Sequence, residues 1–167
     1  MRPIAQGIAA QLADAAAEQR EVDFYSSFAQ RLPLQVICQM LAIPSVDHEQ
    51  LGAWTADLNL ATGYATTEER LVVDRAMRCF EDYARDLIRE RRQRPGDDLL
   101  SSLISAEEAG DRLSSQDLIA MIVQILYAGH ETTRNLIGNG LFVLLENPDQ
   151  LAQLRSDRSL LDPTVEE

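Results

Sequence analysis

The longest apolar segment of this chain is residues 114–145, which read SSQDLIAMIVQILYAGHETTRNLIGNGLFVLL. Apolar residues recur at helical spacing through Leu118, Ile122 and Leu126, and the spacing resumes at Leu136. Other apolar residues lie between these positions, so the helix is apolar nearly all round, which is typical of a helix buried inside a protein. At 1.5 Å per residue the segment would be about 45 Å long. We therefore expect one long, buried central helix.

The middle of that helix carries residues that a purely structural helix would not favour. Gly129 lowers helix stability by about 1 kcal/mol relative to alanine, and Thr132 can bond back to the carbonyl of Ala128, which bends a helix. A buried carboxylate at Glu131 is costly unless it is paired or used. Locally unfavourable choices of this kind are expected at functional sites. We predict a site, and a bend in the helix, at residues 128–133.

The string AGHETT at residues 128–133 resembles the oxygen-activating motif of the cytochrome P-450 family, the haem-thiolate monooxygenases. That motif is alanine or glycine, glycine, any residue, an acid, threonine, and then threonine or serine. The flanking segments GDDLLSSLI, DRLSSQDLIAMI and ENPDQLAQLR are similar to the bacterial soluble branch. The resemblance covers essentially the whole chain. It implies an all-α fold in which residues 1–167 are an incomplete P-450 domain, its helical middle part.

The resemblance also implies roles for residues of the central helix. The hydroxyl of Thr132 would hydrogen-bond the oxygen molecule being activated, and Glu131 would help to deliver protons from solvent. Ala128, Gly129 and Thr133 would line the distal face of the haem. The alternative is that Glu131 only pairs with an arginine and that Thr132 only packs.

Substrate contacts are expected from the first half of the central helix and from the connection before the fourth helix. Ile125, one turn before the motif, is the best single candidate, and Met121 lies one turn earlier. The connection spans residues 58–67. Ordinary core packing is an equally good explanation of Ile125.

The implied enzyme activates O2 and inserts one oxygen atom into a small organic substrate. Its cofactor would be haem iron, and its partner an electron-donor protein such as a ferredoxin or a flavin reductase. Neither Cys38 nor Cys79 lies in the glycine-rich loop that holds the iron-ligating thiolate, so no metal ligand is predicted in this chain. We expect the chain alone to be inactive and not to hold haem. The alternative function is a truncated, non-catalytic helical remnant or an interaction module.

Charge and motif spacing exclude several other functions. The formal net charge is −12, and all 15 cations are arginines, so neither nucleic acid nor an anionic membrane is an expected partner. The one dense basic run, residues 89–94, is predicted to be a solvated helix end. His130 and Glu131 begin a zinc-protease pattern, but Arg134 stands where the second histidine would be.

The rest of the chain is predicted to be helical. Helices are expected at about residues 4–18, 33–41, 47–58, 67–92, 98–106 and 148–155, with a connector at 21–31 and a tail after 155. Trp54 is expected to anchor the core. No signal peptide is recognisable, and the two cysteines are expected to be reduced, so a cytoplasmic location is predicted.

Overall fold

The computed structural model describes residues 2–108 and 113–166, and over these ranges it is helical without any β-strand. The α-helices are α1 (Arg2–Ala17), α2 (Arg31–Met40), α3 (His48–Leu58), α4 (Thr67–Gln93), α5 (Leu99–Glu108), α6 (Ser115–Glu146), α7 (Pro148–Ser156) and α8 (Leu161–Glu166). Shorter helical turns are η1 (Tyr25–Ala29), η2 (Ser45–Asp47), η3 (Asn59–Thr62) and η4 (Arg158–Leu160). The all-α prediction is confirmed. The helical turns after residue 157 were not predicted.

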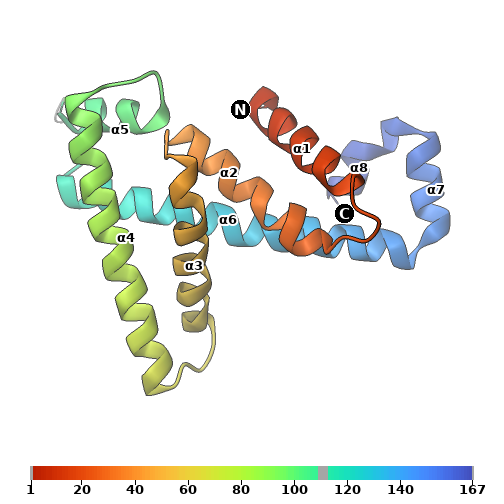
Figure 1. The fold of residues 1–167 in the computed structure, drawn as a ribbon, viewed down its shortest axis with the longest axis horizontal. Helices are drawn as coiled ribbons and strands as arrows, with labels where there is room; N and C mark the ends of the chain where they lie inside the picture. The colour runs from red at the N-terminus through yellow and green to blue at the C-terminus, as the bar shows by residue number, and fades with distance from the viewer. Residues whose placement is uncertain (1, 109–112, 167) are drawn as a thin grey trace.

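Helix α6 is the axis of the molecule and runs along its longest dimension (Figure 1). Helix α2 packs against its middle, and α3 and α4 lie side by side and cross its N-terminal half. Helices α7 and α8 lie near its C-terminal end. Helices α2, α3, α4, α5 and α7 therefore contact α6 directly, whereas α1 packs on α2 and η1.

The start of α6 is fixed by a reciprocal cap. The Asp117 backbone N–H donates to Ser114 Oγ at 3.1 Å, and the Ser114 backbone N–H donates to Asp117 Oδ2 at 3.0 Å. This capping box satisfies two backbone donors that the first turn of a helix leaves free. Pro148, at the first turn of α7, follows the end of α6 at Asn147. Each end of α6 lies within one residue of the segment 114–145 from which the helix was predicted.

Burial divides α6 into two halves, which corrects the prediction of a helix buried throughout. Its buried residues are Leu118, Ile119, Ile122, Val123, Leu126 and His130, all in the first half. In the second half Leu136 is 61% exposed and Phe142 63% exposed. The reason is that α2, α3, α4 and α5 pack on the first half, whereas η1 and α7 are the elements that contact the rest.

Trp54 behaves as the expected core anchor. Its ring meets Phe80 edge-on at 5.4 Å and Tyr83 at 6.0 Å between centroids. The Tyr83 hydroxyl donates to Asp47 Oδ2 at 2.8 Å, and burial together with this bond raises the pKa of Tyr83. These contacts hold α3 and α4 together beside α6.

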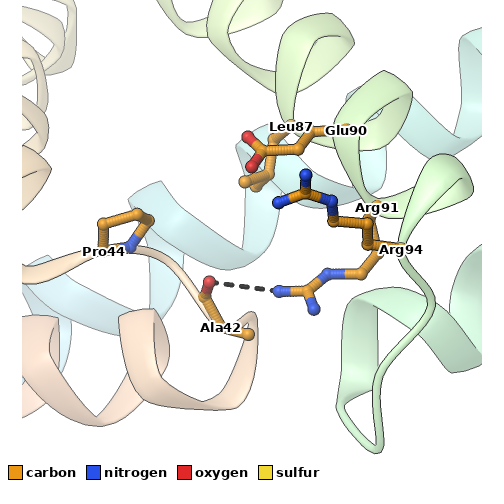
Figure 2. Close-up of a pocket in the computed structure, with 6 residues that line it drawn as sticks. All are labelled: Ala42, Pro44, Leu87, Glu90, Arg91 and Arg94. Carbon is orange, nitrogen blue, oxygen red and sulfur yellow. Dashed lines mark hydrogen bonds between the residues drawn. The ribbon is translucent and has the colours of Figure 1, made fainter.

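The arginine run at the end of α4 is only partly solvated, contrary to the prediction. The Arg91 guanidinium donates to the carbonyl of Ala42 at 3.3 Å and lies 3.2 Å from Asp98 Oδ2. Figure 2 shows Arg91 and Arg94 at a small pocket of about 120 Å³ beside the Ala42 carbonyl. Arg92 pairs with Glu107 of α5 at 2.7 Å. The run therefore docks α4 onto the turn after α2 and onto α5.

Gly129 allows α2 to approach α6 closely. A Cβ atom built on Gly129 would lie 2.8 Å from Ile37 Cδ1, which is closer than two carbon atoms can pack. A side chain at residue 129 would therefore displace the end of the Ile37 side chain.

This close contact predicts a coupling between the two residues. Gly129→Ala overpacks the contact, and Ile37→Val removes Cδ1. The double variant should therefore lose less unfolding free energy than the two single variants lose together, by on the order of 1 kcal/mol. Unfolding free energies of the parent, both single variants and the double variant measure this coupling. Gly140→Ala is the control, because no atom lies within 4 Å of its added Cβ. Additive effects at residues 129 and 37 would contradict the prediction.

Candidate functional site

The predicted site residues follow one another along α6, and five positions share one side of it. Met121, Ile125 and Ala128 are half-buried, and Thr132 and Leu136 are exposed. The spacing of four, three, four and four residues puts them in one stripe of a helix with 3.6 residues per turn. We call this stripe the open face of α6. It combines apolar side chains, a small residue and one hydroxyl.

The Thr132 hydroxyl makes the predicted bond along the helix. Its Oγ1 donates to the Ala128 carbonyl oxygen at 2.9 Å. Residues 128–133 nevertheless remain α-helical, so the predicted bend is not seen as a break in the helix. A carbonyl oxygen has two lone pairs, and that of Ala128 can accept this bond without giving up its helical one. The lone pairs of Oγ1 remain available on the open face.

Glu131 points away from the open face and is held by three side chains. Asn59 Nδ2 donates to Glu131 Oε2 at 2.7 Å. Arg134 forms an ion pair with Oε1, and Asn135 Nδ2 donates to the same oxygen at 3.2 Å. The side chains of Glu131 and Arg134 are only 20% and 12% exposed. The carboxylate is thus largely withdrawn from bulk water and fully paired.

Tyr25 completes this cluster from the other side. The Arg134 guanidinium carbon lies 5.4 Å from the centre of the Tyr25 ring, within the range of a cation–π contact. The Tyr25 hydroxyl donates to Asn135 Oδ1 at 3.3 Å. Sequence reasoning missed Tyr25, and it included Asn59 only within the connection 58–67 expected to contact substrate. The two residues lie 110 and 72 residues from their partners in the cluster. No local pattern marks such distant pairs.

Gly129 and Thr133 do not belong to the open face. Gly129 is turned toward α2, where it meets Ile37. Thr133 follows it by four residues, which puts it on the same side of the helix, and it is exposed. Their predicted contact with a haem stays a prediction.

His130 is fully buried, at 0% exposure. Its Nε2 lies 3.0 Å from the backbone carbonyl oxygen of Gln30, so this nitrogen must carry the proton and donate it. Burial lowers the pKa of His130, despite the bond to Gln30. The neutral ring therefore ties α6 to the start of α2. The sequence had marked this residue only as a variable position of the motif.

The buried ring makes the stability of the chain depend on pH. The unfolded chain binds a proton at His130 at pH values where the folded chain does not, so the free energy of unfolding should fall as the pH drops through about 6.5. His130→Gln keeps an N–H donor but does not titrate, and it should lose less stability between about pH 7.5 and 5. The pKa values of the capping carboxylates Glu69 and Asp117 are lowered, so these groups stay ionised across this pH range. Their contribution to the free energy of unfolding is lost only at lower pH. Denaturant titrations across the range test the difference, and identical slopes would refute it.

The two cysteines, Cys38 and Cys79, are free thiols. Cys38 is fully buried, and desolvation, with a smaller effect of the Asp47 charge, raises its pKa to about 12. It is therefore a protonated thiol at neutral pH. Cys79 lies on α4 and is half-buried. Within residues 2–108 and 113–166, no three histidine, cysteine, aspartate or glutamate side chains are grouped as metal ligands.

The model of the cytochrome P450 family matches residues 56–160, which include the end of α3, all of α4 and α6, and α7. The chain belongs to the cytochrome P450 family. The resemblance drawn from AGHETT and its flanks is confirmed, and so is the assignment of the fold to the helical part of the P450 fold.

Individual relatives extend this similarity along the whole chain. Cytochrome P450 107B1 of Saccharopolyspora erythraea is 42% identical over 167 residues, which cover 100% of this chain and 40% of the relative. The 6-deoxyerythronolide B hydroxylase of the same organism is 38% identical, with 100% and 41% covered. The crystal structure of the myxobacterial P450 CYP267B1 in complex with myristic acid superimposes with a TM-score of 0.91 at 36% identity, covering 99% of this chain and 40% of that one. The chain thus spans about 40% of the length of such relatives.

No helix among the described residues is long and apolar enough to cross a membrane.

Proposed function

We propose that this chain is the oxygen-side wall of a haem-dependent monooxygenase, with Thr132 and Glu131 serving oxygen activation and proton delivery. The observation that carries the proposal is the open face of α6, where Thr132 stands between Ala128 and Leu136, with the withdrawn carboxylate of Glu131 one residue earlier in the helix. Bound haem iron supplies the chemistry that splits O2 and transfers one oxygen atom to an organic substrate. The remaining work falls to the residues of the chain.

Each residue of the open face has a physical task in this proposal. Met121 and Ile125 offer half-buried apolar surface, which favours an apolar organic substrate and excludes water. Thr132 Oγ1 donates its hydrogen to the Ala128 carbonyl oxygen. Its lone pairs are therefore free to accept a hydrogen bond from a water or from a protonated group. It thereby orients a proton donor at the open face.

Glu131 is the proposed proton carrier. Its Oε1 is held by Arg134 and Asn135 on α6, and its Oε2 by Asn59 at the start of η3, so the carboxylate has a fixed position. Protons reach a dry pocket only through positioned groups, and a carboxylate at the edge of such a pocket can take a proton from water and pass it inward. Electrons would come from a donor protein such as a ferredoxin or a flavin reductase.

The test of this proposal uses the intact haem-containing protein to which the chain belongs. It is supplied with reduced nicotinamide, an electron-donor system, ¹⁸O₂ and a panel of apolar probes that includes fatty acids and macrolactones. We expect a hydroxylated or epoxidised product that carries a single ¹⁸O atom. A haem-loaded protein that consumes electrons and yields no labelled product with any probe would contradict the proposal.

A further inference from the structure

We propose that Asn59 is a positioning residue that serves Glu131 in both of its protonation states. Its Nδ2 donates to the ionised carboxylate, and its Oδ1 accepts from the carboxylic acid. The inference rests on the proposed function, in which Glu131 takes up and releases a proton.

The contact joins two parts of the fold. Asn59 begins η3, directly after α3 ends at Leu58, and its Nδ2 lies 2.7 Å from Glu131 Oε2 on α6. The Thr62 hydroxyl donates to the backbone carbonyl of Asn59 at 2.7 Å and so fixes the turn that carries it. The turn that carries Asn59 is therefore fixed, and with it the position of the side-chain amide beside Glu131.

The other end of the same amide has no partner. Asn59 Oδ1 is buried and accepts no hydrogen bond from the residues that the structure describes. A buried amide oxygen without a partner costs about 1–3 kcal/mol, so its presence requires a reason. A second orientation of the amide, in which this oxygen is used, would provide one.

A half-turn of the amide exchanges Nδ2 and Oδ1 without changing the shape of the side chain. When Glu131 is ionised, Oε2 only accepts, and Nδ2 must face it. When the proton sits on Oε2, its O–H must be received by an acceptor, and Oδ1 fills that role after the half-turn. Asn59 can thus pair with Oε2 whether or not the proton is there.

The two other partners of Glu131 both contact Oε1 and leave Oε2 to Asn59. Arg134 only donates, so it favours an unprotonated Oε1. Asn135 Nδ2 donates to the same Oε1 at 3.2 Å, and the Tyr25 hydroxyl donates to Asn135 Oδ1 at 3.3 Å. The exchangeable proton therefore belongs on Oε2, the oxygen that faces Asn59.

The experiment compares Asn59→Leu, Asn59→Lys, Glu131→Gln and the double variant Asn59→Leu/Glu131→Gln in the intact haem-containing protein. Asn59→Leu removes both hydrogen-bonding functions at similar volume, and it should slow product formation about tenfold with the KM for substrate nearly unchanged. In the Glu131→Gln background the same change should have less than about a twofold effect, because the proton it serves is gone.

Asn59→Lys separates positioning from simple contact. Lysine donates to an ionised Glu131 but accepts nothing, so it should keep the parent's unfolding midpoint and still slow product formation about tenfold. The resting protein, with its asparagines labelled with ¹⁵N, supplies a readout apart from turnover. The Asn59 side-chain amide resonances should move on Glu131→Gln.

Three outcomes would overturn the inference. The first is that Asn59→Lys forms product at the parent's rate. The second is that Asn59→Leu slows product formation as much in the Glu131→Gln background as in the parent. The third is that the Asn59 amide resonances do not shift on Glu131→Gln. If Asn59→Leu fails to fold, product formation by Asn59→Lys and the Asn59 amide resonances still test the inference. If instead Glu131→Gln itself leaves turnover unchanged, the proposed function fails, and the inference fails with it.

Discussion

Thr132→Ala should separate electron consumption from product formation in the intact haem-containing protein. The side chain is exposed on the open face, and among residues 2–108 and 113–166 its hydroxyl bonds only to the Ala128 carbonyl oxygen, at 2.9 Å. Its loss removes a hydrogen-bonding oxygen and little packed surface, so haem content and substrate affinity should stay nearly unchanged. Product formed per reduced nicotinamide should fall about tenfold, and hydrogen peroxide should take its place, since two electrons and two protons reduce O2 to peroxide.

The measurement is the ratio of product to nicotinamide consumed, together with the peroxide released. Thr132→Ser is the matched control, because it keeps the hydroxyl and loses only the methyl group. It should retain most of the parent's ratio. If Thr132→Ala also retains it, Thr132 is a structural residue here and its role in oxygen activation is disproved.

The helices could be predicted from sequence because their signals are local. The capping pair Ser114 and Asp117, the proline at the start of α7 and the apolar spacing of α6 all lie within a few residues of the features that they specify. The AGHETT motif was equally local, and it marked the family and the position of Thr132 within it.

The environment of Glu131 could not be predicted, because it depends on distant segments. Asn59 and Tyr25 reach the cluster only once α3 and η1 have packed against α6. The same holds for the contact of Gly129 with the Ile37 side chain of α2. The exposure of Leu136 could not be predicted either. A periodic pattern shows that a helix has an apolar face, but not which element packs on that face.

Glu131→Gln is expected to have the largest effect of any single change at this site. The variant keeps the shape of the side chain and can still bond to Asn59 and Arg134, but it cannot carry a proton. Positioned proton-transfer groups contribute roughly 10²- to 10⁴-fold to a rate, so turnover should fall by a factor of that order. The free energy of unfolding should fall by about 1–3 kcal/mol, because a charge-assisted hydrogen bond becomes a neutral one.

The alternative is that Glu131 only pairs with Arg134, and Arg134→Gln distinguishes the two roles. This variant breaks the same ion pair, and it should cost a similar amount of stability, but it leaves the carboxylate in place. If Glu131 carries protons, Arg134→Gln should slow turnover far less than Glu131→Gln does. Single-turnover rates and denaturant unfolding of both variants give the comparison. Equal losses of rate in the two variants would mean that the ion pair is what matters, and that Glu131 is a structural residue of α6.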